Sequence, residues 1–229
     1  MQRSPIALRM ASTEVIAAIS EEISRATGAP FSGSYGSGGA GGGSGASTFI
    51  IQDGKSKREY FVKMANLGGF DMLRTEYEGI KVMHQTNSIR VPKPICYGSA
   101  DHNSFAVFEK LSLGGRADPA LSGRKLAEMH THTSPNGKFG WDFTNTCGAT
   151  PQPNQWCDTW AEFWDTQRLG HILNLADRSG GNFPEATELR AKVKSILEKH
   201  ECEPSAVHGD LWGGNIGATK DGDTVIYGW

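Results

Sequence analysis

The chain has 229 residues, 38% of them hydrophobic, which is enough apolar material to bury a core in one large domain or two small lobes. Its formal net charge of −2, without a lysine-rich run or an RNA-binding aromatic motif, argues against a nucleic-acid partner. No apolar run approaches the roughly 18 residues of a membrane span, so we expect no membrane partner.

Two features bear on localisation. The four cysteines, at positions 96, 147, 157 and 202, are scattered and lack CxxC spacing. This usage is typical of free thiols in a reducing compartment, so we expect a cytoplasmic protein. Residues 1–11 contain two arginines and no acid, which leaves open the stub of a plastid or mitochondrial transit peptide, although a frayed tail is the favoured interpretation.

The first predicted element is a helix that begins after Ser12 and ends at Gly28. Pro30 stands just beyond this glycine, where a proline prevents the helix from continuing. The apolar residues that recur at helical spacing are Val15, Ile16, Ile19 and Ile23.

Residues 32–47 are mostly glycine and serine, and they lead directly into an apolar run, residues 48–51. Such a composition is typical of a flexible linker between lobes. We favour a different interpretation, a loop that folds over phosphates, because glycine lets backbone N–H groups approach an anion closely. The glycines of this loop expected to bind a nucleotide are Gly39, Gly41, Gly42 and Gly43.

An Asp-Gly turn at residues 53–54 separates the run 48–51 from a second predicted strand, residues 59–63. Lys63 ends this strand, and Glu76 lies in a predicted helix, residues 71–84, beside its apolar stripe. A strand lysine paired with a helix glutamate holds the nucleotide phosphates in kinase-type sites. Taken alone, each residue is more often a solvated surface charge.

Residues 95–98 and 104–108 are predicted to be two further strands. Glu109 and Leu111 follow them, at the place where the hinge of a two-lobed kinase binds adenine through backbone groups. Helical patterns then cover residues 121–130, 160–176 and 185–200. Strands followed by helices predict an α+β fold. We expect an N-terminal nucleotide-binding lobe, residues 1–111, and a helical catalytic lobe, residues 112–229.

Residues 208–215 read HGDLWGGN and follow a short predicted strand at residues 206–207. Asp210 and Asn215 are five residues apart, which is the spacing of a phosphotransferase catalytic loop. In such a loop the Asp accepts the proton of the attacking hydroxyl and the Asn binds a magnesium ion, for which oxygen ligands are suited. The alternative is a loop in which the Asp caps a turn, and residue types alone do not decide between the two.

With Lys63, Glu76 and the octet in this order, the chain resembles the fructosamine kinase family, also called ketosamine or protein-ribulosamine 3-kinases. The pair Leu211 and Trp212 distinguishes the octet of this family from related loops. A second signature with the same resemblance comprises residues 138–141, 147–148, 151–152, 154–156, 160, 163 and 168–169.

The resemblance implies a protein-kinase-like, two-lobed fold and the transfer of the γ-phosphoryl group of ATP to the 3-hydroxyl of a ketosamine, free or on a glycated protein. The phosphorylated adduct is unstable, so the reaction would remove glycation. By the same resemblance, Asp210 is the catalytic base, Asn215 a Mg²⁺ ligand, Lys63 the phosphate anchor and Glu76 its partner. On the substrate side, Trp212 forms a wall of the sugar pocket and His208 braces the catalytic loop.

The chain departs from the family pattern in two places. Gly228 stands where the family has the Asp that binds the second metal, and the helices that follow in the family are not in this sequence. We therefore expect a lobe that is incomplete at its C-terminus, with weak activity and with the apolar side chains of residues 225–227 poorly covered. The glycine loop also lacks the redox-active cysteine of some relatives, which excludes dimerisation through that thiol.

Two rival functions remain open at this point. One is a small-molecule kinase for an aminoglycoside or choline-like alcohol, against which Trp212 and the second signature argue. The other is a catalytically impaired nucleotide-binding module, which Gly228 favours. The preferred sugar and the oligomeric state do not follow from the sequence.

Overall fold

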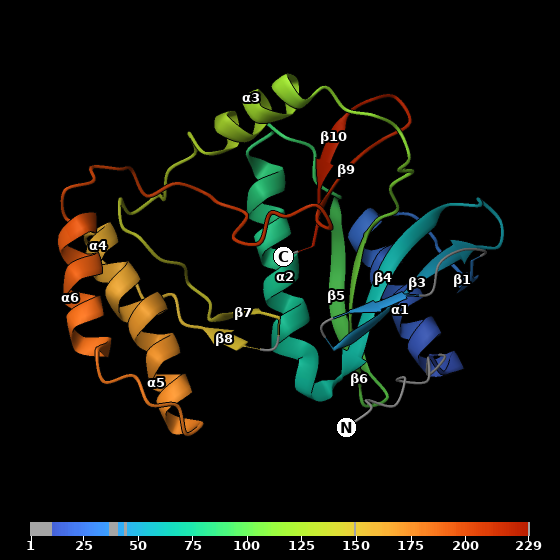
Figure 1. The fold of residues 1–229 in the computed structure, drawn as a ribbon. Helices are drawn as coiled ribbons and strands as arrows, with labels where there is room; N and C mark the ends of the chain where they lie inside the picture. The colour runs from blue at the N-terminus through green and yellow to red at the C-terminus, as the bar shows by residue number, and fades with distance from the viewer. Residues whose placement is uncertain (1–10, 37–40, 44, 149, 229) are drawn as a thin grey trace.

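The computed structural model describes residues 11–36, 41–43, 45–148 and 150–228. Gly39 and most of the N-terminal segment with the two arginines lie outside the described residues. The described part has a sheet followed by helices, so the predicted α+β class is confirmed (Figure 1).

Helix α1 (Thr13–Thr27) begins and ends where the sequence predicts. The hydroxyl of Ser12 accepts a hydrogen bond from the backbone N–H of Val15, which satisfies one of the free donors of the first turn. Gly28 ends the helix with φ at +67°, a left-handed conformation that costs glycine little. The buried residues Val15, Ile19 and Ile23 form one apolar face.

The main sheet is antiparallel and has the strand order β1-β3-β4-β6-β5, with β2 paired to one end of β3. Each predicted strand of this region is present, and the connection between β3 and β4 begins at the predicted Asp-Gly turn. The strands are β1 (Gly33–Tyr35), β2 (Gly41–Gly43), β3 (Ala46–Asp53), β4 (Glu59–Asn66), β5 (Pro94–Ala100) and β6 (Asn103–Glu109).

A helix covers each face of this sheet. Helix α1 packs on one face, in a core that includes Ile19, Ile51 and Val107. Helix α2 (Phe70–Gln85), which follows a short 3-10 turn (Leu67–Gly69), packs on the other face, where the core includes Leu73 and Phe108. Burial of these side chains stabilises the layered arrangement, at about 1.5–3 kcal/mol for each large apolar group.

The helical part lies on the far side of α2 from the sheet, and a small hairpin lies between α2 and α5 (Figure 1). The sequence did not predict this hairpin, β7–β8. It did not predict β9 either, which pairs with the predicted strand β10. The elements after β6 are α3 (Pro119–Met129), β7 (Asn145–Cys147), β8 (Thr150–Gln152), α4 (Trp160–Phe163), a π-helical turn (Trp164–Leu169), α5 (Gly170–Arg178), α6 (Ala186–Leu197), β9 (Ile216–Ala218) and β10 (Thr224–Ile226).

Two sequence predictions about the C-terminal region are wrong. Residues 206–207 are not a strand: the backbone N–H of Ala206 bonds to His132, and Val207 is 60% exposed. The side chains of Val225 and Ile226 are fully buried rather than poorly covered. Ile226 lies in the core beneath α2, and its N–H donates to the carbonyl of Arg90, so earlier segments of the chain cover this strand.

The remaining predictions concern helices, thiols and membranes. All four cysteines are free thiols. Helix α6 is present, but none of its residues is buried, and Ile196 of its predicted apolar side is 60% exposed. Among the described residues, no helix is long and apolar enough to cross a membrane.

Candidate active site

An ion pair joins the sheet to helix α2. Lys63 is on β4 and Glu76 is on the second turn of α2, and the Lys63 ammonium contacts a carboxylate oxygen of Glu76. The carboxylate side chain is only 9% exposed and the lysine side chain 24%. The structure therefore brings together the two charges that the sequence pairs, in a partly desolvated position where the interaction is stronger than on an open surface.

The parts of the glycine-rich segment that the structure describes pair with the sheet, which argues against a linker between lobes. Strand β1 pairs with one end of β3, and Gly41, Gly42 and Gly43 pair with the other end, opposite residues 46–48. Thr48 in turn lies opposite Lys63 in the register of β3 and β4. The segment therefore returns to the sheet beside Lys63, as a loop that folds over phosphates requires.

The loop between residues 208 and 215 holds Asp210 and Asn215 together. The carboxamide of Asn215 donates to the carboxylate of Asp210, with 3.0 Å between Nδ2 and Oδ2, and to the backbone oxygen of Asp210 at 2.9 Å. The second carboxylate oxygen of Asp210 has no hydrogen-bond partner among the described residues. One oxygen is thus oriented by Asn215, and the other is available to accept a proton.

His208, at the start of this loop, is buried, with only 2% of its surface exposed. Its Nδ1 accepts a hydrogen bond from the backbone N–H of Asp210 at 3.3 Å, which places the proton of the neutral ring on Nε2. Burial lowers the pKa of His208 below its ordinary value of 6.5, although the carboxylate of Asp210 opposes this shift. Nε2 is buried and has no hydrogen-bond partner among the described atoms.

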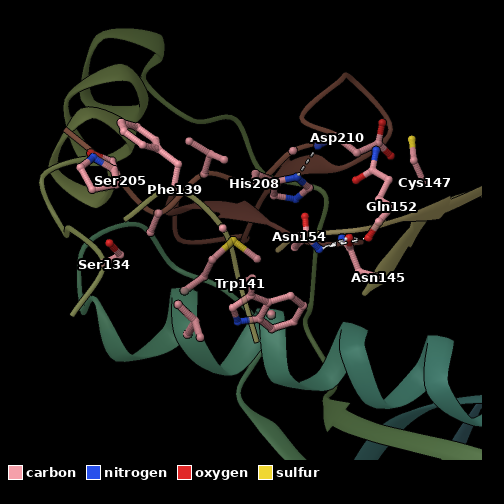
Figure 2. Close-up of a pocket in the computed structure, with 18 of the residues that line it drawn as sticks. Ser134, Phe139, Trp141, Asn145, Cys147, Gln152, Asn154, Ser205, His208 and Asp210 are labelled. Carbon is pink, nitrogen blue, oxygen red and sulfur yellow. Dashed lines mark hydrogen bonds between the residues drawn. The ribbon is translucent and has the colours of Figure 1, made fainter. Parts of the chain in front are cut away.

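A single cavity of about 1090 Å³ is bordered by the Lys63–Glu76 ion pair and by the hydrogen-bonded Asp210 and Asn215. Figure 2 shows the part of its lining around His208 and Asp210. Lys63 and Glu76 border it from the sheet and α2, and Asp210 and Asn215 border it from the loop before β9. Its size exceeds the usual range of about 300–1,000 Å³ for small-molecule sites. It could hold a nucleotide phosphate chain and a second substrate together.

Three predicted site residues lie elsewhere. Glu109 and Leu111 are not among the residues that border the cavity. The N–H of Glu109 donates to the carbonyl of Lys93, and its carboxylate pairs with Arg90 at 2.7 Å. Trp212 is 64% exposed and its ring lies against Gly214, outside the cavity. The structure therefore does not place Trp212 in a wall of the sugar pocket: the loop turns sharply at Gly213 and Gly214, and the ring points away.

The structure adds polar cavity residues to which the sequence assigns no role. Asn145, Gln152 and Asn154 border the cavity on the side of the β7–β8 hairpin, and Figure 2 shows Gln152 extending toward Asp210. Arg168, from the π-helical turn, also borders it. Gln152, Asn154 and Arg168 fall within the second signature. The sequence therefore marked their positions, but it assigned these side chains no chemical role.

The oxygen atoms of the 208–215 loop suit a hard cation such as Mg²⁺. Since Nδ2 of Asn215 faces Asp210, its Oδ1 points toward Gly228, where a Cβ atom would come within 2.6 Å of it. The glycine therefore leaves this hard oxygen accessible. Among the described residues no group of three or more His, Cys, Asp or Glu could hold a metal by itself. A cation here would take its other ligands from phosphate and water, as Mg²⁺ commonly does.

The chain is similar to known proteins over most of its length. A family model described as fructosamine kinase matches residues 15–228. A probable ketoamine kinase of Synechocystis sp. is 42% identical over 180 residues, which are 78% of this chain and 60% of that protein. A chloroplastic protein-ribulosamine 3-kinase of Oryza sativa subsp. indica is 39% identical over 172 residues, which are 73% of this chain and 50% of that protein.

The fold also has a close counterpart among solved structures. The crystal structure of a provisionally named fructosamine-3-kinase from Haemophilus somnus matches with a TM-score of 0.79 and 26% identity, over 92% of this chain and 70% of that one. The predicted protein-kinase-like α+β fold is confirmed by this match. The chain spans 50–60% of the length of the two curated relatives.

Proposed function

This chain belongs to the fructosamine kinase family, and we propose that it carries the phosphate- and sugar-binding site of a kinase that transfers the γ-phosphoryl group of ATP to the 3-hydroxyl of a ketosamine. The ketosamine is either free or attached to a glycated protein, and the name of the rice relative, protein-ribulosamine 3-kinase, favours the attached form. Removal of the sugar from the amine would follow phosphorylation.

The observation that carries the proposal is that the Lys63–Glu76 pair and the Asp210–Asn215 pair border one cavity. Phosphoryl transfer needs a cation for the phosphates and an oxygen base for the hydroxyl within one enclosed space. A loop in which Asp210 merely caps a turn would not need the buried Lys63–Glu76 pair on the opposite side of the cavity.

Different residues of this chain would bind the phosphates, accept the proton and position the groups that react. Lys63, held by Glu76, would bind the phosphates, and the backbone N–H groups of Gly41, Gly42 and Gly43 would cover them. The unpaired oxygen of Asp210 would accept the hydroxyl proton as the hydroxyl oxygen attacks phosphorus. His208 would hold the backbone of Asp210, and Asn215 would orient its carboxylate.

Asn215 would hold a Mg²⁺ ion through Oδ1, together with the phosphate oxygens of ATP. The ion would neutralise negative charge on the phosphates when it is bound. The role of this chain is to supply one hard oxygen at the right place and to keep it pointed away from Asp210.

Phosphate transfer from radiolabelled ATP to ribulosyl-lysine and fructosyl-lysine, with Mg²⁺, tests the proposal. We expect transfer by the 229-residue chain and none by Asp210→Asn, since an amide does not accept the proton. Choline and an aminoglycoside serve as comparison substrates, and faster transfer to either would favour the rival small-molecule kinase. Binding of Mg-ATP without transfer to any of the four would favour the impaired nucleotide-binding module.

A further inference from the structure

The β7–β8 hairpin presents a pair of carboxamides to the cavity. Asn145 lies directly opposite Gln152 in the antiparallel register, so the two side chains project from the same face of the hairpin. Both border the cavity that contains Asp210. Gly148, with φ at +59°, lies in the turn that allows the two short strands to pair so tightly.

A buried asparagine holds this face in position. Asn154 is 6% exposed, and its Nδ2 donates to Asn145 Oδ1 and the carbonyl of Phe143, each at 2.8 Å, and to the carbonyl of Gln152 at 3.2 Å. Its Oδ1 accepts from the guanidinium of Arg168 at 2.7 Å. Asn154 therefore hydrogen-bonds to both strands of the hairpin, and Arg168 of the π-helical turn hydrogen-bonds to Asn154.

This arrangement leaves hydrogen-bonding capacity unused at the cavity surface. Oδ1 of Asn145 is occupied by Asn154, but its Nδ2 has no protein partner among the described residues. The carboxamide of Gln152 has no hydrogen-bond partner at either atom in the same part of the chain, since the bond that Asn154 donates to this residue is accepted by its backbone oxygen. A carboxamide offers two donors and two acceptor positions, so this pair could bond several neutral hydroxyl groups at once.

We propose that Asn145 and Gln152 form a platform that binds the hydroxyl groups of the ketose and presents one of them to Asp210. The platform deepens the proposed function and rests on it. The two side chains are uncharged and offer both donors and acceptors, which matches the hydroxyl groups of the substrate, because each hydroxyl also donates and accepts. A polar site of this kind rejects ligands that lack the matching hydroxyls, because its own groups are then left unpaired.

Substitution of the platform should raise the KM for the ketosamine and leave the KM for ATP unchanged. Gln152→Leu keeps the bulk of the side chain and removes its hydrogen bonds, and Asn145→Leu does the same on the opposite strand. We expect each change to raise the ketosamine KM about tenfold or more. The matched control is Thr150→Val, on the same face of the hairpin but not bordering the cavity. It should keep the wild-type KM for both substrates.

A second measurement separates this inference from the proposed function. Calorimetric titration of the chain with fructosyl-lysine, without nucleotide, reports binding independently of turnover, and thermal melts show whether each variant is folded. Binding by wild type that is weakened in Gln152→Leu supports the platform whether or not phosphate is transferred. Equal affinity in wild type and both folded leucine variants overturns the platform alone. Absence of both binding and transfer in wild type overturns the proposed function and the platform with it.

Discussion

Asn215 and Asp210 are joined side chain to side chain, with 3.0 Å between the carboxamide nitrogen and one carboxylate oxygen. Asn215→Leu removes this donor and leaves the volume nearly unchanged. We predict a fall in kcat on the order of 10²-fold, because the carboxylate loses the group that orients it and the proposed Mg²⁺ site loses its oxygen ligand. Steady-state kinetics at saturating ketosamine and ATP measures the change. A kcat within twofold of wild type would show that Asp210 needs no such orientation.

The Lys63–Glu76 pair should govern nucleotide affinity. Lys63→Met abolishes ATP binding in this prediction, but it also leaves the buried Glu76 carboxylate unpaired, which costs about 3–5 kcal/mol of stability. The double variant Lys63→Met with Glu76→Gln removes both charges and should recover much of that stability. Calorimetric titration with Mg-ATP, after denaturation curves confirm folding, distinguishes the two effects. Undiminished ATP affinity in the folded double variant would remove Lys63 from the site.

His208 should make the fold sensitive to mild acid. Because its pKa is lower in the folded chain than the ordinary value of 6.5, the unfolded chain binds the proton more tightly as the pH falls. This contribution to stability is present above pH 6.5 and is lost as the pH falls toward the pKa of the folded state. Urea denaturation at pH 7.5 and pH 5.5 measures the loss. His208→Asn keeps an acceptor near the Asp210 N–H and should show a smaller dependence, and an equal dependence would contradict the assignment.

Gly228 should not tolerate a side chain. Its φ of +74° costs other residues about 1–2 kcal/mol, and a Cβ would lie 2.6 Å from Asn215 Oδ1. We therefore predict that Gly228→Ala displaces Asn215 and lowers Mg²⁺-dependent ATP turnover and the melting temperature together. Gly213→Ala, in the same loop but with no atom within 4 Å of its Cβ position, is the matched control. Unchanged turnover in Gly228→Ala would show that Asn215 can move freely.

The sequence predicts well where local rules and long-range contacts agree. Ser12 and Gly28 fix the ends of α1 because each satisfies a specific backbone need. Lys63 and Glu76 could be paired because strand and helix periods place both side chains on facing surfaces. The comparisons confirm the family, and the roles of the individual site residues remain predictions that the experiments above address.

The sequence is less informative where tertiary contacts decide the conformation. Each strand of the β7–β8 hairpin has only three residues, too few for an alternating pattern, and Asn154 and Arg168 hold it from outside. Trp212 is an aromatic residue in the 208–215 loop, yet two following glycines let its ring turn outward. Neither outcome depends on the identity of neighbouring residues alone.

The π-helical turn of residues 164–169 amounts to one residue inserted into an otherwise regular helix. Each residue of an α-helix advances the chain by about 100° around the axis, so the insertion rotates everything that follows by that angle. Near the start of the turn, Asp165 faces α6 and pairs with Arg190 at 2.8 Å. Near its end, Arg168 donates to Asn154. Deleting Thr166 would restore the ordinary helical period and change the direction of Arg168 relative to Asp165. The extra residue therefore lets one helical segment contact both Arg190 of α6 and Asn154 beside the hairpin.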